Sequence, residues 1–128
     1  MIYVDSSVVL ARVFAEPSSP QDAFWAGRLI ASRLLEYEVW NRIHARAPAV
    51  GYRDRARQVL ALVDLIEMAP HVLARALEPF LLRVRTLDGL HLASMLWLRA
   101  TGESVELASY DARLTAAAQA LGISLAAL

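Results

Sequence analysis

Short apolar runs alternate with segments of helical periodicity along the chain, and this pattern restricts the fold more than any other feature. The runs lie at residues 1–4, 29–31, 66–69, 105–108 and 123–125, and apolar residues recur at helical spacing between them. Strands that alternate with helices favour a mostly parallel central sheet covered by helices on both faces. We therefore predict an α/β fold.

The helices predicted between these runs have recognisable starts and ends. One helix, with Ala56, Val59, Leu60 and Val63 on a common face, is expected to follow a loop at residues 48–51. The long helix before residue 105 and the last helix should each close at a glycine. The other helices are predicted to begin near Ser6 or Ser7, Pro20, Ser32, Pro70, Leu87 and Asp111.

Length and composition exclude several classes of protein. The 128 residues suit one domain, and no apolar run approaches the roughly 18 residues of a membrane span. The first residues also lack the pattern of a secretion signal, so we expect a cytoplasmic location and no membrane contact. The sequence has no cysteine, which excludes disulfides and thiolate zinc sites. It has no lysine, which excludes a P-loop.

Basic residues are all arginine, and several of them gather around the loop predicted at residues 48–51. The net charge of zero excludes the overall basic field of a typical DNA-binding domain. A local arginine group can still hold a phosphate backbone through bidentate contacts, with Arg42 and Arg46 as candidates. An ordinary solvated helix surface explains the same pattern. The group comprises Arg42, Arg46, Arg53, Arg55 and Arg57.

Four acidic residues stand where an apolar run stops or within a predicted helix. They are Asp5, Glu38, Asp88 and Asp111. An open parallel sheet gathers ligands outside the carboxyl ends of its strands, so acids far apart in sequence can meet there. Without a cation, such carboxylates repel by roughly 4 kcal/mol per close pair at an effective dielectric near 20. Taken singly, each aspartate could merely cap a helix.

Four motifs then appear in an order and spacing typical of a known family. They are residues 1–7 (MIYVDSS), Ser32 with Glu38 six residues later, residues 86–93 (TLDGLHLA), and residues 109–111 (SYD). Together they resemble the PIN-domain ribonucleases, in particular the VapC toxins of bacterial and archaeal toxin–antitoxin pairs. The resemblance implies a single PIN domain over residues 1–128.

The resemblance also implies an acidic site. Glu36 competes with Glu38 for the helix position, because the two lie about 200° apart around a helix and cannot enter one site together. The spacing from Ser32 that is usual in the family favours Glu38. The implied acids are Asp5, Glu38, Asp88 and Asp111, with Asp5, Asp88 and Asp111 as metal ligands and the hydroxyls of Ser6 and Ser109 in support.

His91 follows Asp88 by three residues and could be read as a metal ligand or a general base. A local hydrogen bond between Asp88 and His91, one helical turn apart, is the simpler interpretation. The resemblance gives a histidine at this position no catalytic role.

The function implied by the resemblance is metal-dependent hydrolysis of RNA phosphodiester bonds. Oxygen ligands suit Mg²⁺ or Mn²⁺, and the sequence is compatible with either one or two bound ions. The implied partners are a VapB-like antitoxin that covers the acidic site and a second copy of the chain in a homodimer. Two alternatives stay open: a PIN-like binding module without catalysis, and a nuclease of similar chemistry that acts on DNA.

Overall fold

A five-stranded parallel sheet forms the centre of the molecule. The computed structural model describes residues 1–46 and 49–128, and within them the strand order is β3-β2-β1-β4-β5. All four neighbouring pairs are parallel, which confirms the predicted α/β class. The strands are β1 (Ile2–Val4), β2 (Leu29–Ser32), β3 (Val63–Ile66), β4 (Glu106–Ala108) and β5 (Ser124–Leu125).

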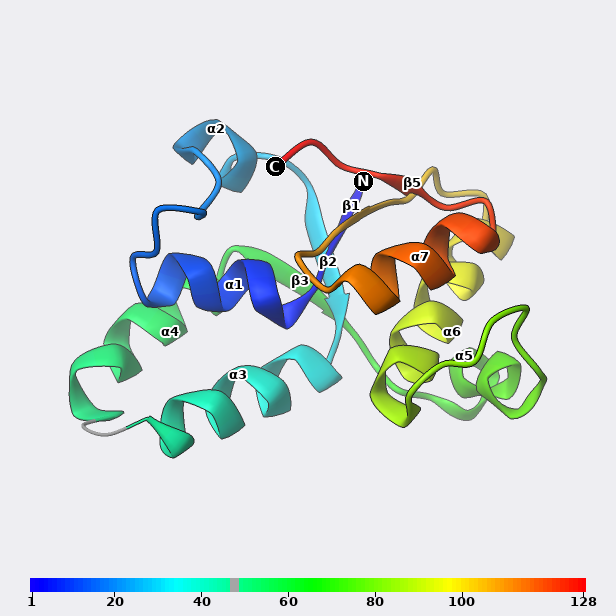
Figure 1. The fold of residues 1–128 in the computed structure, drawn as a ribbon, viewed down its shortest axis with the longest axis horizontal. Helices are drawn as coiled ribbons and strands as arrows, with labels where there is room; N and C mark the ends of the chain where they lie inside the picture. Colours follow the sequence, from blue (N-terminus) through cyan, green and yellow to red (C-terminus); the bar gives the residue numbers. More distant parts are fainter. Residues whose placement is uncertain (47–48) are drawn as a thin grey trace.

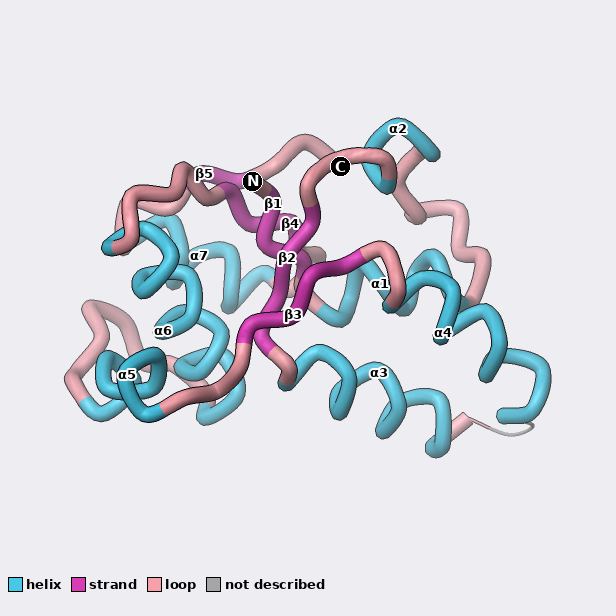
Figure 2. Tube along the Cα trace, turned by 180° about the vertical axis from the view of Figure 1, so that it is seen from behind, coloured by secondary structure: helices cyan, strands magenta, loops and turns pink. Residues whose placement is uncertain are grey.

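Helices cover both faces of this sheet, as predicted. Helices α1, α3 and α4 lie on one side of the strands, and α5, α6 and α7 lie on the other (Figures 1 and 2). The helices are α1 (Ser6–Val13), α2 (Asp22–Trp25), α3 (Leu34–Ala45), α4 (Arg53–Leu60), α5 (Pro70–Leu73), α6 (Thr86–Ala100) and α7 (Ala112–Ala120), with 3₁₀ turns η1 (Ala49–Tyr52) and η2 (Ala74–Leu77).

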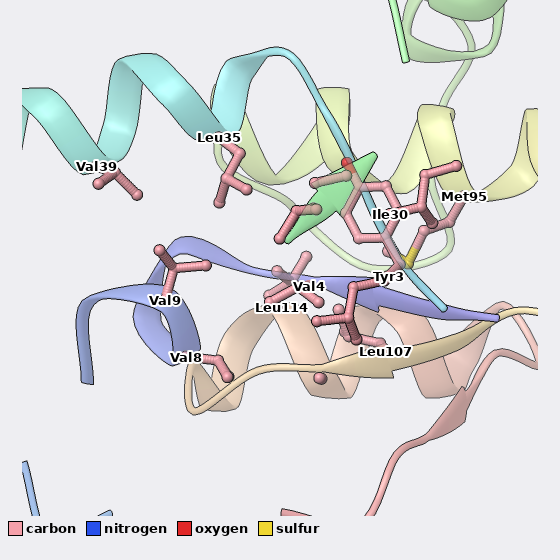
Figure 3. Packing of buried hydrophobic residues seen from close by; sticks show 14 of the residues in the cluster. Tyr3, Val4, Val8, Val9, Ile30, Leu35, Val39, Met95, Leu107 and Leu114 are labelled. Atoms are coloured by element: carbon pink, nitrogen blue, oxygen red, sulfur yellow. The ribbon is translucent and has the colours of Figure 1, made fainter. Parts of the chain in front are cut away.

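The central strand β1 is buried on both faces. Tyr3 and Val4 point to opposite sides of the sheet and are fully buried. Figure 3 shows Val9 of α1 close to Leu35 and Val39 of α3 on one side of the core. Each such side chain contributes roughly 1.5–3 kcal/mol through burial. This packing fixes where β1 ends, and therefore where Asp5 lies.

The third strand begins earlier than predicted. The helix expected to continue through Val63 ends at Leu60, and Val63 instead opens β3 opposite Leu29 of β2. The predicted strand at residues 66–69 therefore overlaps β3 only at Ile66. Val63 satisfies both patterns, since it continues the helical spacing and is also β-branched. Backbone pairing with β2 decides between them.

Two predicted helix ends are confirmed, and the predicted loop at residues 48–51 is described from Ala49 onward, where it forms the 3₁₀ turn η1. Gly102 and Gly122 follow α6 and α7 with φ of 94° and 71°, a conformation that favours glycine. Pro48, in the loop predicted at residues 48–51, lies outside the described residues. In the described part of the chain, no helix combines the length and apolar character that crossing a membrane requires.

Candidate functional site

The four acids singled out in the sequence line one cleft of about 620 Å³ at the carboxyl end of the sheet. They come from four separate segments: the end of β1, the middle of α3, the first turn of α6, and the start of α7. Glu36 is absent from this lining and pairs with Arg33 at 3.0 Å. The charged lining residues are Asp5, Glu38, Asp88, Asp111, Arg42 and Arg85.

Asp5 follows the last residue of β1 and caps α1. Its Oδ2 accepts hydrogen bonds from the Ser7 amide at 3.2 Å, the Ser7 hydroxyl at 2.5 Å and the Ser109 hydroxyl at 2.9 Å. Only 6% of the residue is exposed. Because these three bonds all fall on Oδ2, the second carboxylate oxygen stays available for a cation.

The supporting hydroxyls differ in part from those implied by the sequence. Ser109 contacts Asp5 and also accepts a hydrogen bond from the Asp111 amide at 3.0 Å. Ser7, rather than Ser6, holds Asp5, and it also accepts from the Tyr110 amide at 3.0 Å. Ser6 lies in the cleft lining. The N-cap geometry decides this, because a capping side chain reaches the second helical residue more readily than the first.

Asp88 and Asp111 share a cation supplied by the chain itself. Arg85 donates from Nε to Asp88 Oδ2 at 2.8 Å, and from Nη2 to Asp88 Oδ1 at 3.3 Å and to Asp111 Oδ2 at 2.5 Å. The Asp88 carboxylate is nearly buried, while half of the Arg85 side chain is exposed. Sequence reasoning missed Arg85. Its signal was an arginine that directly precedes the helix carrying Asp88 and stands three residues before that acid.

The environment shifts the protonation of Asp111. Burial raises its pKa, but the Arg85 guanidinium and the amides of Leu114 and Arg113 outweigh burial and hold the pKa below its ordinary value. Asp111 also caps α7 through those two amides, at 2.8 Å from Arg113 and 3.2 Å from Leu114. The ionised form of Asp111 is therefore favoured in the folded chain.

We predict that Asp111→Asn will make the free energy of unfolding less dependent on pH in the acid range. The folded pKa lies below the unfolded value near 3.9, so the stability from Asp111 is fully present above about pH 4 and is lost as pH falls through the folded pKa. Urea unfolding from pH 6 to 2.5 should show a smaller loss for Asp111→Asn than for wild type. The control is Asp54→Asn on α4; equal acid limbs for wild type and Asp111→Asn would contradict the prediction.

Glu38 reaches the cleft beside a buried histidine. His91 Nε2 lies 3.0 Å from Glu38 Oε2, and His91 Nδ1 lies 2.8 Å from the Tyr3 hydroxyl. Burial lowers the pKa of His91, but its partners Tyr3 and Glu38 outweigh burial and raise the pKa above its ordinary value. The predicted local bond between Asp88 and His91 is wrong, because both ring nitrogens have these partners and Asp88 binds Arg85.

The oxygens at the base of the cleft could hold a divalent metal. Asp5, Glu38 and His91 each offer one ligand atom, and these atoms lie within 4.8 Å of one another. The His91 ring is 1% exposed, so the accessible ligands of this group are the two carboxylates. Carboxylate oxygens are the donors that Mg²⁺ and Mn²⁺ prefer, and the residues present therefore fit such an ion.

The structure separates the two arginines proposed as phosphate contacts. Arg42 lies in the lining of the cleft that also contains Glu38 and Asp5. Arg46 instead stacks its guanidinium over the ring of Phe14, 4.1 Å from the ring centroid. Arg42 is therefore the better placed of the two to meet a ligand bound at the acids.

Comparison with known proteins identifies the family. A family model described as PIN domain matches residues 2–120. The chain belongs to the PIN-domain family. The resemblance seen in the four sequence motifs is thereby confirmed.

Individual relatives match this PIN domain over almost its whole length. The chain is 32% identical to Ribonuclease VapC46 of Mycobacterium tuberculosis, over 98% of the chain and 96% of the relative. It is 30% identical to Ribonuclease VapC35 of the same species, over 99% and 96%. It is 28% identical to Ribonuclease VapC47, also of that species, over 95% and 93%. The similarity therefore includes all four acidic segments of the cleft.

Proposed function

We propose that this PIN domain is a metal-dependent endoribonuclease of the VapC type, the toxin of a toxin–antitoxin pair. The observation that carries the proposal is the convergence of Asp5, Glu38, Asp88 and Asp111, from four separate segments, on one cleft. The similarity to proteins named Ribonuclease VapC supports RNA as the substrate. The proposal includes a cytoplasmic site of action.

The acids are the residues that would hold the ion. When bound, Mg²⁺ or Mn²⁺ supplies Lewis acidity for phosphodiester hydrolysis. Ser7 and Ser109 hold the Asp5 carboxylate in place, with one oxygen directed to the hydroxyls. Asp88 and Asp111 line the same cleft and would complete an oxygen-only ligand set once Arg85 gives way to the ion. Arg42 lies where it can contact a phosphate of the RNA chain.

Cleavage rates on RNA and DNA strands of matched sequence distinguish a ribonuclease from a DNA-directed nuclease. The proposed activity requires faster cleavage of the RNA strand by the wild-type protein with Mg²⁺ or Mn²⁺. Equal or faster cleavage of the DNA strand would replace the ribonuclease with a DNA-directed enzyme. The two strands should have the same length, end label and ionic conditions, because phosphate contacts are salt-dependent and carry no sequence information.

Partners of two kinds belong to the proposal: a VapB-like antitoxin that covers the cleft, and a second copy of the chain. The cleft lining includes Tyr37 and Leu87, both exposed large apolar side chains, beside the acids. Leu77 and Leu81 are more exposed still. Of these, Tyr37 and Leu87 lie together in one cleft lining, and grouped rather than isolated apolar side chains support contact with another protein surface. Sedimentation of the isolated chain as a monomer at micromolar concentration would contradict the homodimer.

The hydroxyl geometry gives a paired prediction. Ser7→Ala should lower the rate of RNA cleavage roughly tenfold, because Asp5 loses a 2.5 Å charge-assisted hydrogen bond and the Tyr110 amide loses its acceptor. Ser6→Ala should stay within about twofold of wild type, because Ser7 holds Asp5. Initial rates at saturating Mn²⁺ test the pair. A larger loss for Ser6→Ala than for Ser7→Ala would favour the supporting hydroxyl implied by the sequence.

Arg85 and a divalent cation compete for the same oxygens. Arg85→Gln should therefore bind Mn²⁺ about three- to tenfold more tightly than wild type, as measured by calorimetry. Arg83→Gln removes an equal charge two residues away and is the control. Arg85→Lys should give an intermediate affinity for Mn²⁺, because lysine keeps the positive charge but lacks the planar guanidinium that donates to both carboxylates. Unchanged affinity for Arg85→Gln would show that Arg85 does not occupy metal-binding oxygens.

A further inference from the structure

A buried chain of hydrogen bonds runs from the end of β2 to the cleft. The Ser32 amide donates to the Tyr3 hydroxyl at 3.0 Å, and that hydroxyl lies 2.8 Å from His91 Nδ1. His91 Nε2 lies 3.0 Å from Glu38 Oε2. The chain therefore joins β1, β2, α6 and α3 through side chains that are almost completely buried. Only its last member, Glu38, lines the cleft.

The donors and acceptors along this series of hydrogen bonds can be assigned. An ionised carboxylate only accepts hydrogen bonds, so His91 Nε2 carries a hydrogen and donates to Glu38 whether the ring is neutral or protonated. The Tyr3 hydroxyl can both donate and accept, so it meets Nδ1 in either state while still accepting from the Ser32 amide. His91 is therefore held from one side and presents a donor to Glu38 on the other.

The same contacts leave His91 out of the ligand set. The residue is 1% exposed and is absent from the cleft lining, and both of its nitrogens already have partners. Its Tyr3 partner meets it edge-on, with the ring planes at 78°. The ring is thus fixed by packing as well as by hydrogen bonds. A fixed donor beside a flexible glutamate determines where that glutamate's carboxylate lies.

We propose that His91, held by Tyr3, is a positioning residue that fixes the Glu38 carboxylate at the acidic site; this inference rests on the proposed metal-dependent function. The bond to Oε2 leaves Oε1 for the ion. The bond also restricts the Glu38 side chain before the ion arrives. A glutamate on α3 without this bond would lose its rotamer freedom only on binding the ion, and that loss would weaken the affinity. His91 acts through Glu38 and does not touch the substrate.

The test compares variants of two buried residues on α6. His91→Leu removes the donor and fills the space, His91→Gln restores a donor, and Met95→Ala is a matched control one helical turn away that is also fully buried. We expect His91→Leu to weaken Mn²⁺ binding about 10- to 100-fold in calorimetry. His91→Gln should recover most of this loss. Met95→Ala should bind Mn²⁺ within about twofold of wild type despite its lower stability.

Kinetics supply a second readout. In RNA cleavage at saturating Mn²⁺, His91→Leu should lower kcat much more than it changes KM, because the RNA-facing surface is unaltered. Tyr3→Phe keeps the ring in the core and removes only the hydroxyl, so it should weaken Mn²⁺ binding several-fold. This variant carries the test if His91→Leu does not fold.

The outcomes that would overturn the inference are distinct from failure of the proposed function. Wild-type Mn²⁺ affinity in folded His91→Leu, or an equal loss in Met95→Ala, would reduce His91 to a core residue. If His91→Leu does not fold, unchanged Mn²⁺ affinity in Tyr3→Phe would do the same. A wild-type protein that binds no Mn²⁺ would refute the metal site itself, and the positioning role with it.

Discussion

Asp5→Asn is expected to reduce RNA cleavage by about a hundredfold or more while the protein stays folded. The substitution removes the charge of the acid that directly follows the central strand β1 and lines the cleft where the ion would bind. The asparagine side-chain oxygen can still accept from Ser7 and Ser109, so the cap of α1 should survive. Initial rates and thermal unfolding of both proteins, measured in parallel, provide the comparison.

Two control variants accompany this experiment. Asp54→Asn changes an exposed acid on α4 and should cleave RNA at the wild-type rate. Glu36→Gln changes an acid on α3 that lies outside the cleft lining, so it too should leave the rate unchanged. Retained cleavage by Asp5→Asn would remove this residue from the site, whereas a large loss for Glu36→Gln would reopen the choice between Glu36 and Glu38.

Saturating Mg²⁺ is expected to stabilise the folded protein by about 2.7 kcal/mol when present at a hundred times its dissociation constant. The effect requires that the ion binds the folded chain and not the unfolded one. The acids are brought together only by the fold, since they come from four separate segments. Urea unfolding with and without Mg²⁺ measures the change in the free energy of unfolding.

Ionic strength has to be matched in that comparison. Screening by salt alone relieves repulsion among the acids, so NaCl of equal ionic strength is the reference condition. Asp5→Asn should lose most of the Mg²⁺-dependent stabilisation. An equal gain in NaCl and Mg²⁺, or an undiminished gain in Asp5→Asn, would contradict a specific site.

Much of the fold could be predicted because local patterns and tertiary structure agree. The apolar runs at residues 1–4 and 105–108 become the central pair β1 and β4, and the glycines at 102 and 122 end their helices. The third strand was misplaced because Val63 fits a helix and a strand equally well, and only pairing with β2 separates them. Pairing between distant segments is not visible in local spacing.

The site, like the fold, has parts that the sequence predicts and parts that depend on contacts between distant segments. The topology of a parallel sheet was enough to suggest that Asp5 and Asp111 would meet, and the structure brings them into one cleft. Arg85 was missed because its bridge to Asp111 joins the residue before α6 to the residue before α7, 26 positions apart in sequence. His91 was misassigned because its partners Tyr3 and Glu38 are 88 and 53 residues away in sequence. Local spacing suggested the nearer Asp88 instead.

Cleavage of purified cellular RNA by the isolated wild-type protein, with and without divalent metal, tests the central claim most directly. The acidic cleft as a metal-dependent ribonuclease site predicts discrete fragments with Mg²⁺ or Mn²⁺, none with EDTA, and recovery of the fragments when excess metal is restored. Cleavage that continues undiminished in EDTA, or no cleavage by folded protein that binds Mn²⁺, would contradict it.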